Sequence, residues 1–305
     1  DNGSAFQQEN HLYAYDLDIL GERSLFHYLN RTHTFLGRKL LAERLLSPTP
    51  ERILNTQKQI QALTPNLDWR QTFTAYTQQI DDSEDFYTKL SVWAKAPIKL
   101  LSNTMRYTLI ALPILLVVCL LIGYGWDNEL LKTIGNLLLT LNLVIFFSFV
   151  GRITKEKLGF ERTYTMLYAF RECIAQVEAR FPDKNKQAST QIAKLSRLLD
   201  DLDSIGNILV SIPLNAFSFY HIHRYQQLLQ WKAHYAAHIE EWLQSVAEIE
   251  VLCSFANFSY NHPNFIYPTL QNSALLTILS SMSRLLYCSQ ALICRGRVLF
   301  CVLWE

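Results

Sequence analysis

Two long, uncharged apolar runs lie close together in the chain, and they constrain its fold more than any other feature. The first run covers 107–126 and reads YTLIALPILLVVCLLIGYGW, and the second covers 133–151 and reads TIGNLLLTLNLVIFFSFVG. As a helix rising ~1.5 Å per residue, each run would cross a hydrocarbon core of ~30 Å. The pattern predicts a transmembrane helical hairpin over 101–154. The alternative is an apolar hairpin buried in a soluble helical domain.

The charges around the two runs predict a direction for the hairpin. Only Asp127, Glu129 and Lys132 separate the runs as charged residues, whereas cations flank the pair on its outer side, at Lys95, Lys99, Arg106, Arg152, Lys155 and Lys157. By the positive-inside rule, both long arms are then cytoplasmic and the turn faces outward. This arrangement is that of a multi-pass protein of the bacterial inner membrane.

Four residues are the predicted membrane-hairpin site. Tyr107 and Trp126 lie at the ends of the first run, where amphipathic rings prefer the membrane interface. Asn136 and Asn142 lie inside the second run and need hydrogen-bond partners, because lipid offers none. A packed neighbouring helix would supply those partners.

Composition places the remainder of the chain among ordinary soluble helical proteins. Of 305 residues, 50% are hydrophobic and 18% charged, and the apolar excess is concentrated in the two runs. The net charge of +1 gives no electrostatic argument for binding nucleic acid or an acidic substrate. The six cysteines form no CxxC pair, so we expect reduced thiols instead of a zinc site or a disulfide framework.

The fold class predicted is all-α, a bundle of long helices with the hairpin inserted. Residues 1–21 read as an extended lead-in, 22–100 as an N-terminal helical part and 155–272 as a C-terminal long-helix part. Helix-start signals occur at Thr34, at Pro50 and in the acidic stretch before Phe86. The polar start at Asp1 without Met indicates a fragment of a longer protein with no signal peptide.

The most regular apolar pattern predicts one helix from Pro213 to Tyr260. Its apolar positions recur at alternating steps of three and four residues, as in helices that pack along their length. At ~1.5 Å per residue, this helix would be on the order of 60 Å long, so we interpret it as a lever. The residues predicted to pack it are Tyr225, Leu228, Tyr235, Ile239, Trp242, Val246 and Ile249.

No enzyme site is predicted. The sequence contains no GxxxxGK[ST] phosphate loop, no GxGxxG and no GxSxG. His234 and His238 have metal-ligand spacing, but Tyr235 stands where a zinc protease needs Glu, so we interpret both as helix-surface histidines. His221 and His223 lie on different helix faces. We therefore predict no catalytic residue, no metal ligand and no cofactor-binding residue in this chain.

Two stretches carry a resemblance to a known family. Residues 15–48, YDLDILGERSLFHYLNRTHTFLGRKLLAERLLSP, resemble the start of the helical core, or lever, domain of the MutS mismatch-repair family. The matching positions are Leu25, Leu29, Thr32, Thr34, Gly37, Leu40, Leu41, Leu45 and Pro48. Residues 57–63 also fit, and 242–256 and 262–268 are similar to the end of that lever, where the chain turns toward the ATPase domain.

The resemblance is strongest to membrane-associated, MutS-related bacterial proteins, in which a hydrophobic hairpin replaces the DNA clamp. It implies an ATPase domain after the lever, which would bind ATP and magnesium and form a homodimer. This chain shows no phosphate loop for such a domain. The resemblance also admits DNA as a partner, although the net charge gives DNA binding no support.

Three functions compete at this stage. The first is a non-catalytic, membrane-anchored lever that couples a nucleotide-binding domain to the lipid bilayer. The second is a membrane scaffold or sensor unrelated to DNA that uses the long helix for protein contacts, and the third is a soluble DNA-binding clamp. Composition changes after Leu270, since 273–304 holds no acidic residue, so we expect 273–305 to be an atypical tail, truncated or frame-shifted.

Overall fold

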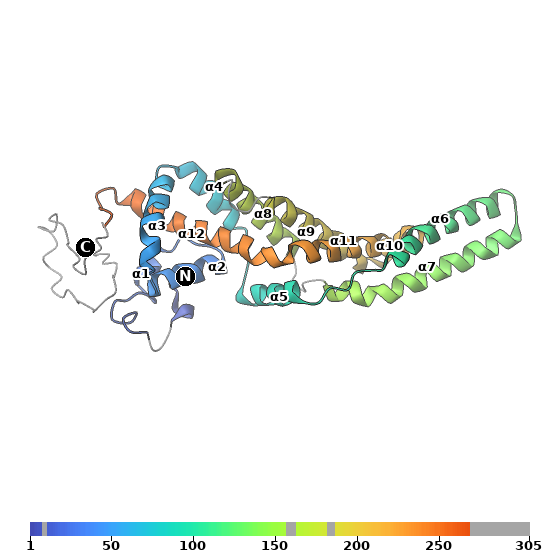
Figure 1. Ribbon diagram of the computed structural model, residues 1–305, viewed down its shortest axis with the longest axis horizontal. Helices are drawn as coiled ribbons and strands as arrows, with labels where there is room; N and C mark the ends of the chain where they lie inside the picture. The colour runs from blue at the N-terminus through green and yellow to red at the C-terminus, as the bar shows by residue number, and fades with distance from the viewer. Residues whose placement is uncertain (8–10, 157–162, 182–186, 269–305) are drawn as a thin grey trace, which may run out of the picture. The chain divides into compact units, whose positions relative to one another are not determined.

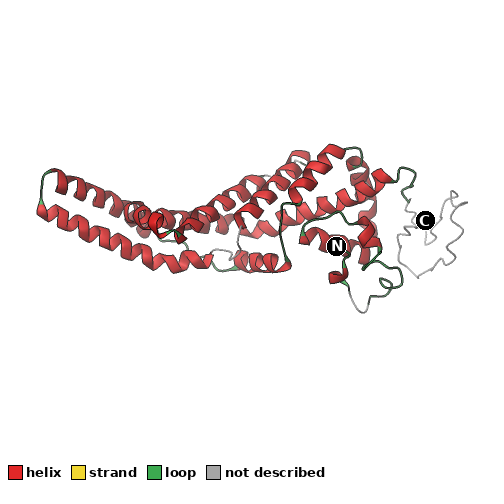
Figure 2. Cartoon of the chain, turned by 180° about the vertical axis from the view of Figure 1, so that it is seen from behind, coloured by secondary structure: helices red, strands yellow, loops and turns green. Residues whose placement is uncertain are grey.

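The computed structural model describes residues 1–7, 11–156, 163–181 and 187–268. Within those ranges every regular element is a helix and none is a strand (Figure 1, Figure 2). The prediction of an all-α fold is therefore confirmed. The predicted tail over 273–305 lies outside the described residues, as does Lys157.

The chain folds into two compact units. The terminal unit combines Asp1–Thr74 with the segment that begins at Ala247, and the central unit is Ala75–Val246. The division falls inside two helices, α4 (Leu67–Thr77) and α12 (Ile239–Asn261).

Local capping signals set the helix starts of the terminal unit. Thr34 Oγ1 accepts a hydrogen bond from the amide of Gly37 at 2.9 Å, and Pro50 lies in the first turn of its helix. Both starts are where the sequence predicts them. In chain order the unit contains η1 (Ser4–Phe6), α1 (Leu25–Leu29), α2 (Phe35–Leu46), α3 (Pro50–Leu63) and most of α4, then the end of α12.

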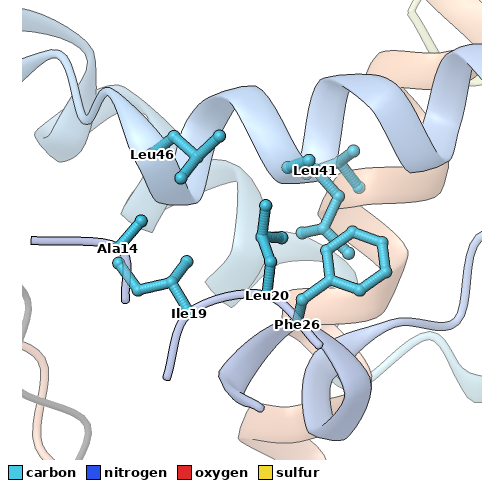
Figure 3. Close-up of a cluster of buried hydrophobic side chains, with 8 residues drawn as sticks. Ala14, Ile19, Leu20, Phe26, Leu41 and Leu46 are labelled. Carbon is cyan, nitrogen blue, oxygen red and sulfur yellow. The ribbon is translucent and has the colours of Figure 1, made fainter. Parts of the chain in front are cut away.

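The core of the terminal unit joins the N-terminal segment to α1, α2 and α12. Figure 3 shows its side chains pointing toward one another. The described part of residues 1–21, expected to be an extended lead-in, instead contains η1 and turns, and its Ala14, Ile19 and Leu20 side chains belong to this cluster. Its members are Ala14, Ile19, Leu20, Phe26, Leu41, Ala42, Leu46 and Val251.

The central unit holds the apolar hairpin and the helices that pack on it. Ser83 Oγ accepts from the amide of Phe86 at 3.3 Å, so the acidic stretch precedes a capped helix as predicted. The elements are α5 (Glu84–Lys95), α6 (Asn103–Gly125), α7 (Glu129–Glu156), α8 (Thr163–Arg180), α9 (Ala188–Asp203), η2 (Ser204–Gly206), α10 (Ile208–Ser218), α11 (Tyr220–Tyr235), η3 (Ala236–His238) and the start of α12.

Helix α9 packs between α8 and α11. Its apolar stripe at helical spacing, Ile192, Leu195, Leu198 and Leu202, is fully or almost fully buried. The indole Nε1 of Trp231 on α11 donates to the carbonyl oxygen of Gln191 at 3.0 Å, which sets the register of the two helices.

The prediction of one unbroken helix from Pro213 to Tyr260 is wrong. Helix α10 begins before Pro213, at Ile208, and ends at Phe219, whose backbone is left-handed with φ 48°. The turn at η3 then separates α11 from α12. The apolar spacing continues in the sequence across both interruptions, because periodicity alone does not register a single left-handed residue.

Candidate membrane hairpin

Helices α6 and α7 pack against each other as an antiparallel pair (Figure 1). Glycines allow the close approach: a Cβ at Gly135 would lie 2.6 Å from Leu120 Cδ2, and one at Gly123 would lie 2.9 Å from the backbone nitrogen of Lys132. Small residues at helix contacts are typical of pairs that associate in lipid. At these two positions the helices approach too closely for a residue larger than glycine.

The outer faces of the pair are apolar and exposed. In the most apolar window of each helix, only 28% of α6 and 22% of α7 is buried. The core helix of a soluble protein would be mostly buried, so this exposure favours a partner that covers apolar surface. Side chains that are at least half exposed are Tyr107, Ile110, Ile114, Leu121, Tyr124, Trp126, Leu130, Leu137, Val144 and Phe147.

A compact polar turn closes the far end of the pair. Asn128 Oδ1 accepts from the amides of Leu130 at 3.1 Å and Leu131 at 3.2 Å, which caps the start of α7. The ammonium of Lys132 pairs with Asp127 and lies 2.8 Å from Glu129 Oε1. The charges of the turn are therefore gathered at one tip.

A charged cluster ties the near end of the pair to the bundle, and we call it the base clamp: Trp93, Glu156 and Lys232. Glu156 Oε2, at the end of α7, accepts from Trp93 Nε1 at 3.0 Å and from Lys232 Nζ at 3.1 Å. Lys232 Nζ also lies 4.7 Å from the centroid of the Trp93 ring. Because the Lys232 side chain is only 1% exposed, this ion pair fixes α5, α7 and α11 in one arrangement.

The structure separates the four predicted hairpin residues into two groups. Tyr107 and Trp126 are exposed near the two ends of α6, and Asn136 is exposed on α7. Asn142 is fully buried, and its Nδ2 donates to the carbonyl oxygen of Ala216 on α10 at 2.8 Å. The partner of Asn142 is thus α10, a helix that the sequence pattern did not delimit.

The predicted lever-packing residues are mostly buried. Tyr225, Leu228, Ile239, Trp242 and Val246 are at most 8% exposed in the central unit, whereas Tyr235 is half-buried. The ring of Trp242 stacks on His238 at 6.1 Å and lies 6.3 Å from the ring of Tyr235. Ile249, at 2% exposed, lies in the terminal unit.

The groups considered for chemistry occupy structural positions. His234 Nδ1 lies 2.7 Å from the carbonyl oxygen of Gln230, and His238 Nδ1 lies 3.8 Å from Glu241 Oε2. No cluster of three or more His, Cys, Asp or Glu residues placed for a metal occurs in the part of the chain that the structure describes. Burial raises the pKa of the Cys253 thiol to about 12, which keeps it protonated and unreactive.

The polar contacts most important to the fold come from residues distant in sequence. Glu250, 2% exposed on α12, accepts from the amides of His33 at 2.8 Å and Thr34 at 3.2 Å, and also bonds the Thr34 hydroxyl. This carboxylate occupies the start of α2, where an anion such as a phosphate would otherwise bind. Sequence reasoning missed it, because a single Glu on a helix carries no local signal.

One family model matches most of the helical framework. The family model of MutS domain III matches residues 12–256, which is most of the chain. The chain belongs to the MutS domain III family. Searches of curated proteins and of solved structures find no match.

In this MutS domain III, the matched range runs through the hairpin as well as both units. The resemblance seen in the sequence at residues 15–48 and 242–256 is therefore confirmed at family level. Two helices long and apolar enough to cross a membrane, α6 and α7, lie inside that range.

Proposed function

We propose that this MutS domain III is a non-catalytic lever anchored in a lipid bilayer by the α6/α7 hairpin. The observation that carries the proposal is the exposed apolar surface of α6 and α7. Burying such a surface in lipid costs no backbone hydrogen bond, because both segments are helical. The polar tip at Asp127 and Lys132 would then lie beyond the far side of the membrane.

The lever part of the proposal rests on the architecture of the helices. Helix α12 belongs to both compact units, so the hairpin-bearing central unit and the terminal unit share one continuous element. In this proposal a separate nucleotide-binding domain holds ATP and magnesium and forms the homodimer, and the lever couples that domain to the membrane. DNA contact forms no part of the proposal, since the net charge is +1.

Site-specific labelling tests the membrane hairpin and its direction. A thiol introduced by Glu129→Cys is suitable, because the Glu129 side chain is 82% exposed and caps no helix. Val92→Cys, on the exposed face of α5, is the matched control for the opposite side. With a membrane-impermeant maleimide on intact cells, we expect labelling of Glu129→Cys and none of Val92→Cys until lysis.

The parent chain with its native cysteines supplies the background for both variants. Equal labelling of the two sites before lysis, or labelling of neither, would contradict the hairpin topology. A purified chain with no ATP hydrolysis above a contaminant control is the expected result for the non-catalytic part, and turnover that survives that control would overturn it.

A further inference from the structure

The two faces of helix α10 have the reverse polarity of a surface helix in a water-soluble protein. Its inward face carries small or polar residues, Ser211, Asn215 and Ala216, all buried. Its outward face carries large apolar residues, with Leu209 88% and Ile208 66% exposed, followed by Val210, Leu214 and Phe217. In water this arrangement exposes the hydrophobic groups that folding normally buries, so it indicates an apolar environment outside α10.

Both ends of α10 are fixed at the same end of the helical bundle. Ser204, just after α9, lies with its Oγ 2.9 Å from Nε2 of His221, at the start of α11. Helix α10 therefore connects α9 to α11 at the level where that pair ends. There it packs against both α6 and α7, and Asn142 reaches its Ala216 carbonyl oxygen at 2.8 Å.

The corner after α10 has its polar groups paired inside the protein. Asn215 Oδ1 accepts from the amide of His221 at 2.9 Å, and Asn215 Nδ2 lies 2.6 Å from both Ser211 O and His221 Nδ1. Irregular backbone is tolerated at membrane depth only where protein satisfies it in this way. Asn215 and His221 supply such pairing at the α10–α11 corner.

The opposite end of α10 fixes how deep the helix can lie. Asn207 makes no side-chain capping hydrogen bond, and its carbonyl oxygen accepts from the Val210 amide, which leaves the amides of Ile208 and Leu209 uncapped. Those amides need water or lipid headgroups, so this end cannot lie in the hydrocarbon centre. With a length of ~16 Å, α10 is also too short to span a bilayer.

Cations lie on the bundle side of α10 on each neighbouring helix. Moving from α10 toward the base clamp, the first formally charged residue is Arg106 on α6, Arg152 on α7 and Arg224 on α11. Arginines at this level can reach phosphate headgroups while their stems stay in apolar surroundings. Arg224 is paired with Asp201 at 3.0 Å, and α9 ends in Asp200, Asp201 and Asp203, so attraction to anionic lipid is offset here.

The dimensions agree with an interfacial depth for α10. The contacts of α10 and its corner meet α7 at Asn142 and α6 near Leu109, which lies beside the His223 side chain. Beyond those levels the hairpin extends ~21 to 24 Å at ~1.5 Å per residue. An interfacial helix sits ~5 to 10 Å into the headgroup and acyl boundary. The hairpin length beyond α10 and the depth of an interfacial helix together are close to the ~30 Å hydrocarbon thickness that the hairpin must cross.

We propose that α10 lies in the near interface of the bilayer, with Leu209, Leu214 and Phe217 among the acyl chains. This inference rests on the proposed membrane hairpin and adds a third lipid-contacting element to it. Helix α10 acts as a depth stop: it prevents the bundle from entering the membrane and the hairpin from sliding out. Apolar burial dominates the contact, so binding does not require anionic lipid.

Depth-dependent quenching tests the position of α10. A fluorescent amino acid is inserted by nonsense suppression at Leu209 and, in separate proteins, at Leu137 and Val92, all of which are at least 66% exposed. A label at such sites disturbs no packing. Each full chain is reconstituted in phosphatidylcholine vesicles that carry a nitroxide either near the headgroup or near the end of the acyl chain.

The three positions are expected to give three different patterns. The label at Leu209 should be quenched more by the shallow nitroxide than by the deep one. The label at Leu137, ~12 Å along α7 from the turn, should show the reverse order. The label at Val92, on α5 beside the base clamp, should be quenched by neither.

The outcomes distinguish this inference from the proposed function. Quenching at Leu137 without quenching at Leu209 would overturn the interfacial α10 and leave the hairpin intact. Absence of quenching at both Leu137 and Leu209 would contradict the membrane hairpin and this inference together. Deep quenching at Leu209 would also overturn the depth stop, because it would place α10 among the hydrocarbon tails. Addition of anionic lipid should leave the label at Leu209 quenched more by the shallow nitroxide than by the deep one.

Discussion

The carboxylate of Glu250 accepts a hydrogen bond of 2.8 Å from the backbone amide of His33, although the two residues are 217 positions apart. The contact caps α2 from a different helix, and it leaves room only for a glycine at position 37, in the first turn of α2. A Cβ on Gly37 would overlap the Glu250 carboxylate and lie 3.0 Å from Thr34 Oγ1. The start of α2 therefore depends on three residues that meet in one buried place: the Glu250 carboxylate, the Thr34 hydroxyl and Gly37, which has no side chain.

Gly37→Ala should destabilise the protein. The added methyl group displaces a buried carboxylate that accepts hydrogen bonds from the amides of His33 and Thr34, and such overpacking costs about 1 to 3 kcal/mol. Gly151→Ala is the matched control, because a Cβ there meets nothing within 4 Å and Ala favours a helix interior. Thermal unfolding in detergent should show a lower melting temperature for Gly37→Ala only. Equal melting temperatures would mean that Glu250 moves aside freely.

Local signals explain what the sequence predicted well. Thr34, Pro50 and Ser83 each act within one helical turn, so the starts of α2, α3 and α5 were readable from a few letters. The hairpin was readable because its apolar runs are long and uncharged. All of these features depend only on neighbours in the sequence.

Contacts between distant residues explain what the sequence could not predict. The break at Phe219 uses a left-handed residue that is neither Gly nor Asn, and its cost is offset by the buried Asn215 and His221 pairing. The sequence did not indicate a role for the buried Lys232, because its partner Glu156 is 76 residues away. The pattern of residues within one segment does not show which distant residue a buried polar side chain will contact.

Stability should fall as the pH drops below neutrality, in part through His33. Burial, then the nearby Arg38, lowers the pKa of His33 below its ordinary value. The unfolded chain therefore binds a proton at a higher pH than the folded chain, so the stabilisation is present above pH ~6.5 and decreases as the pH falls toward the folded pKa.

His33→Gln should reduce this pH dependence, because Gln does not titrate and the residue 33 amide still bonds Glu250. The measurement is the change in melting temperature between mildly alkaline and mildly acidic buffer for the variant and the parent. His234→Gln, at an exposed position, is the matched control and should leave the slope unchanged. An identical slope in all three proteins would contradict the role of His33.

Trp242→Ala should cost about 3 to 5 kcal/mol, because removal of a buried indole leaves a cavity. Trp242 is 7% exposed and packs on Tyr235 and His238. Glu241→Ala, on the exposed face of α12, is the matched control and should cost under about 0.5 kcal/mol. Equal melting temperatures for the two variants would mean that Trp242 does not contribute to the packing of the lever.

The base clamp should show strong coupling between Lys232 and Glu156. Lys232→Met alone leaves a Glu156 side chain that is 20% exposed with Trp93 Nε1 as its remaining clamp partner, and removing one member of such a pair costs about 3 kcal/mol. Lys232→Met combined with Glu156→Gln should be more stable than Lys232→Met alone. The Gln oxygen can still accept from Trp93, and no unpaired charge remains.

The exposed pair Lys95 and Glu240, 3.2 Å apart, supplies a matched control for that cycle. Its side chains are 71% and 53% exposed, so solvent screens the pair and its coupling should stay below about 1 kcal/mol. Double-mutant cycles from thermal or chemical unfolding give both coupling energies. A coupling at the base clamp no larger than that of the exposed pair would mean that Lys232 and Glu156 do not hold the hairpin to α11. The near end of α7 would then be positioned by apolar packing alone.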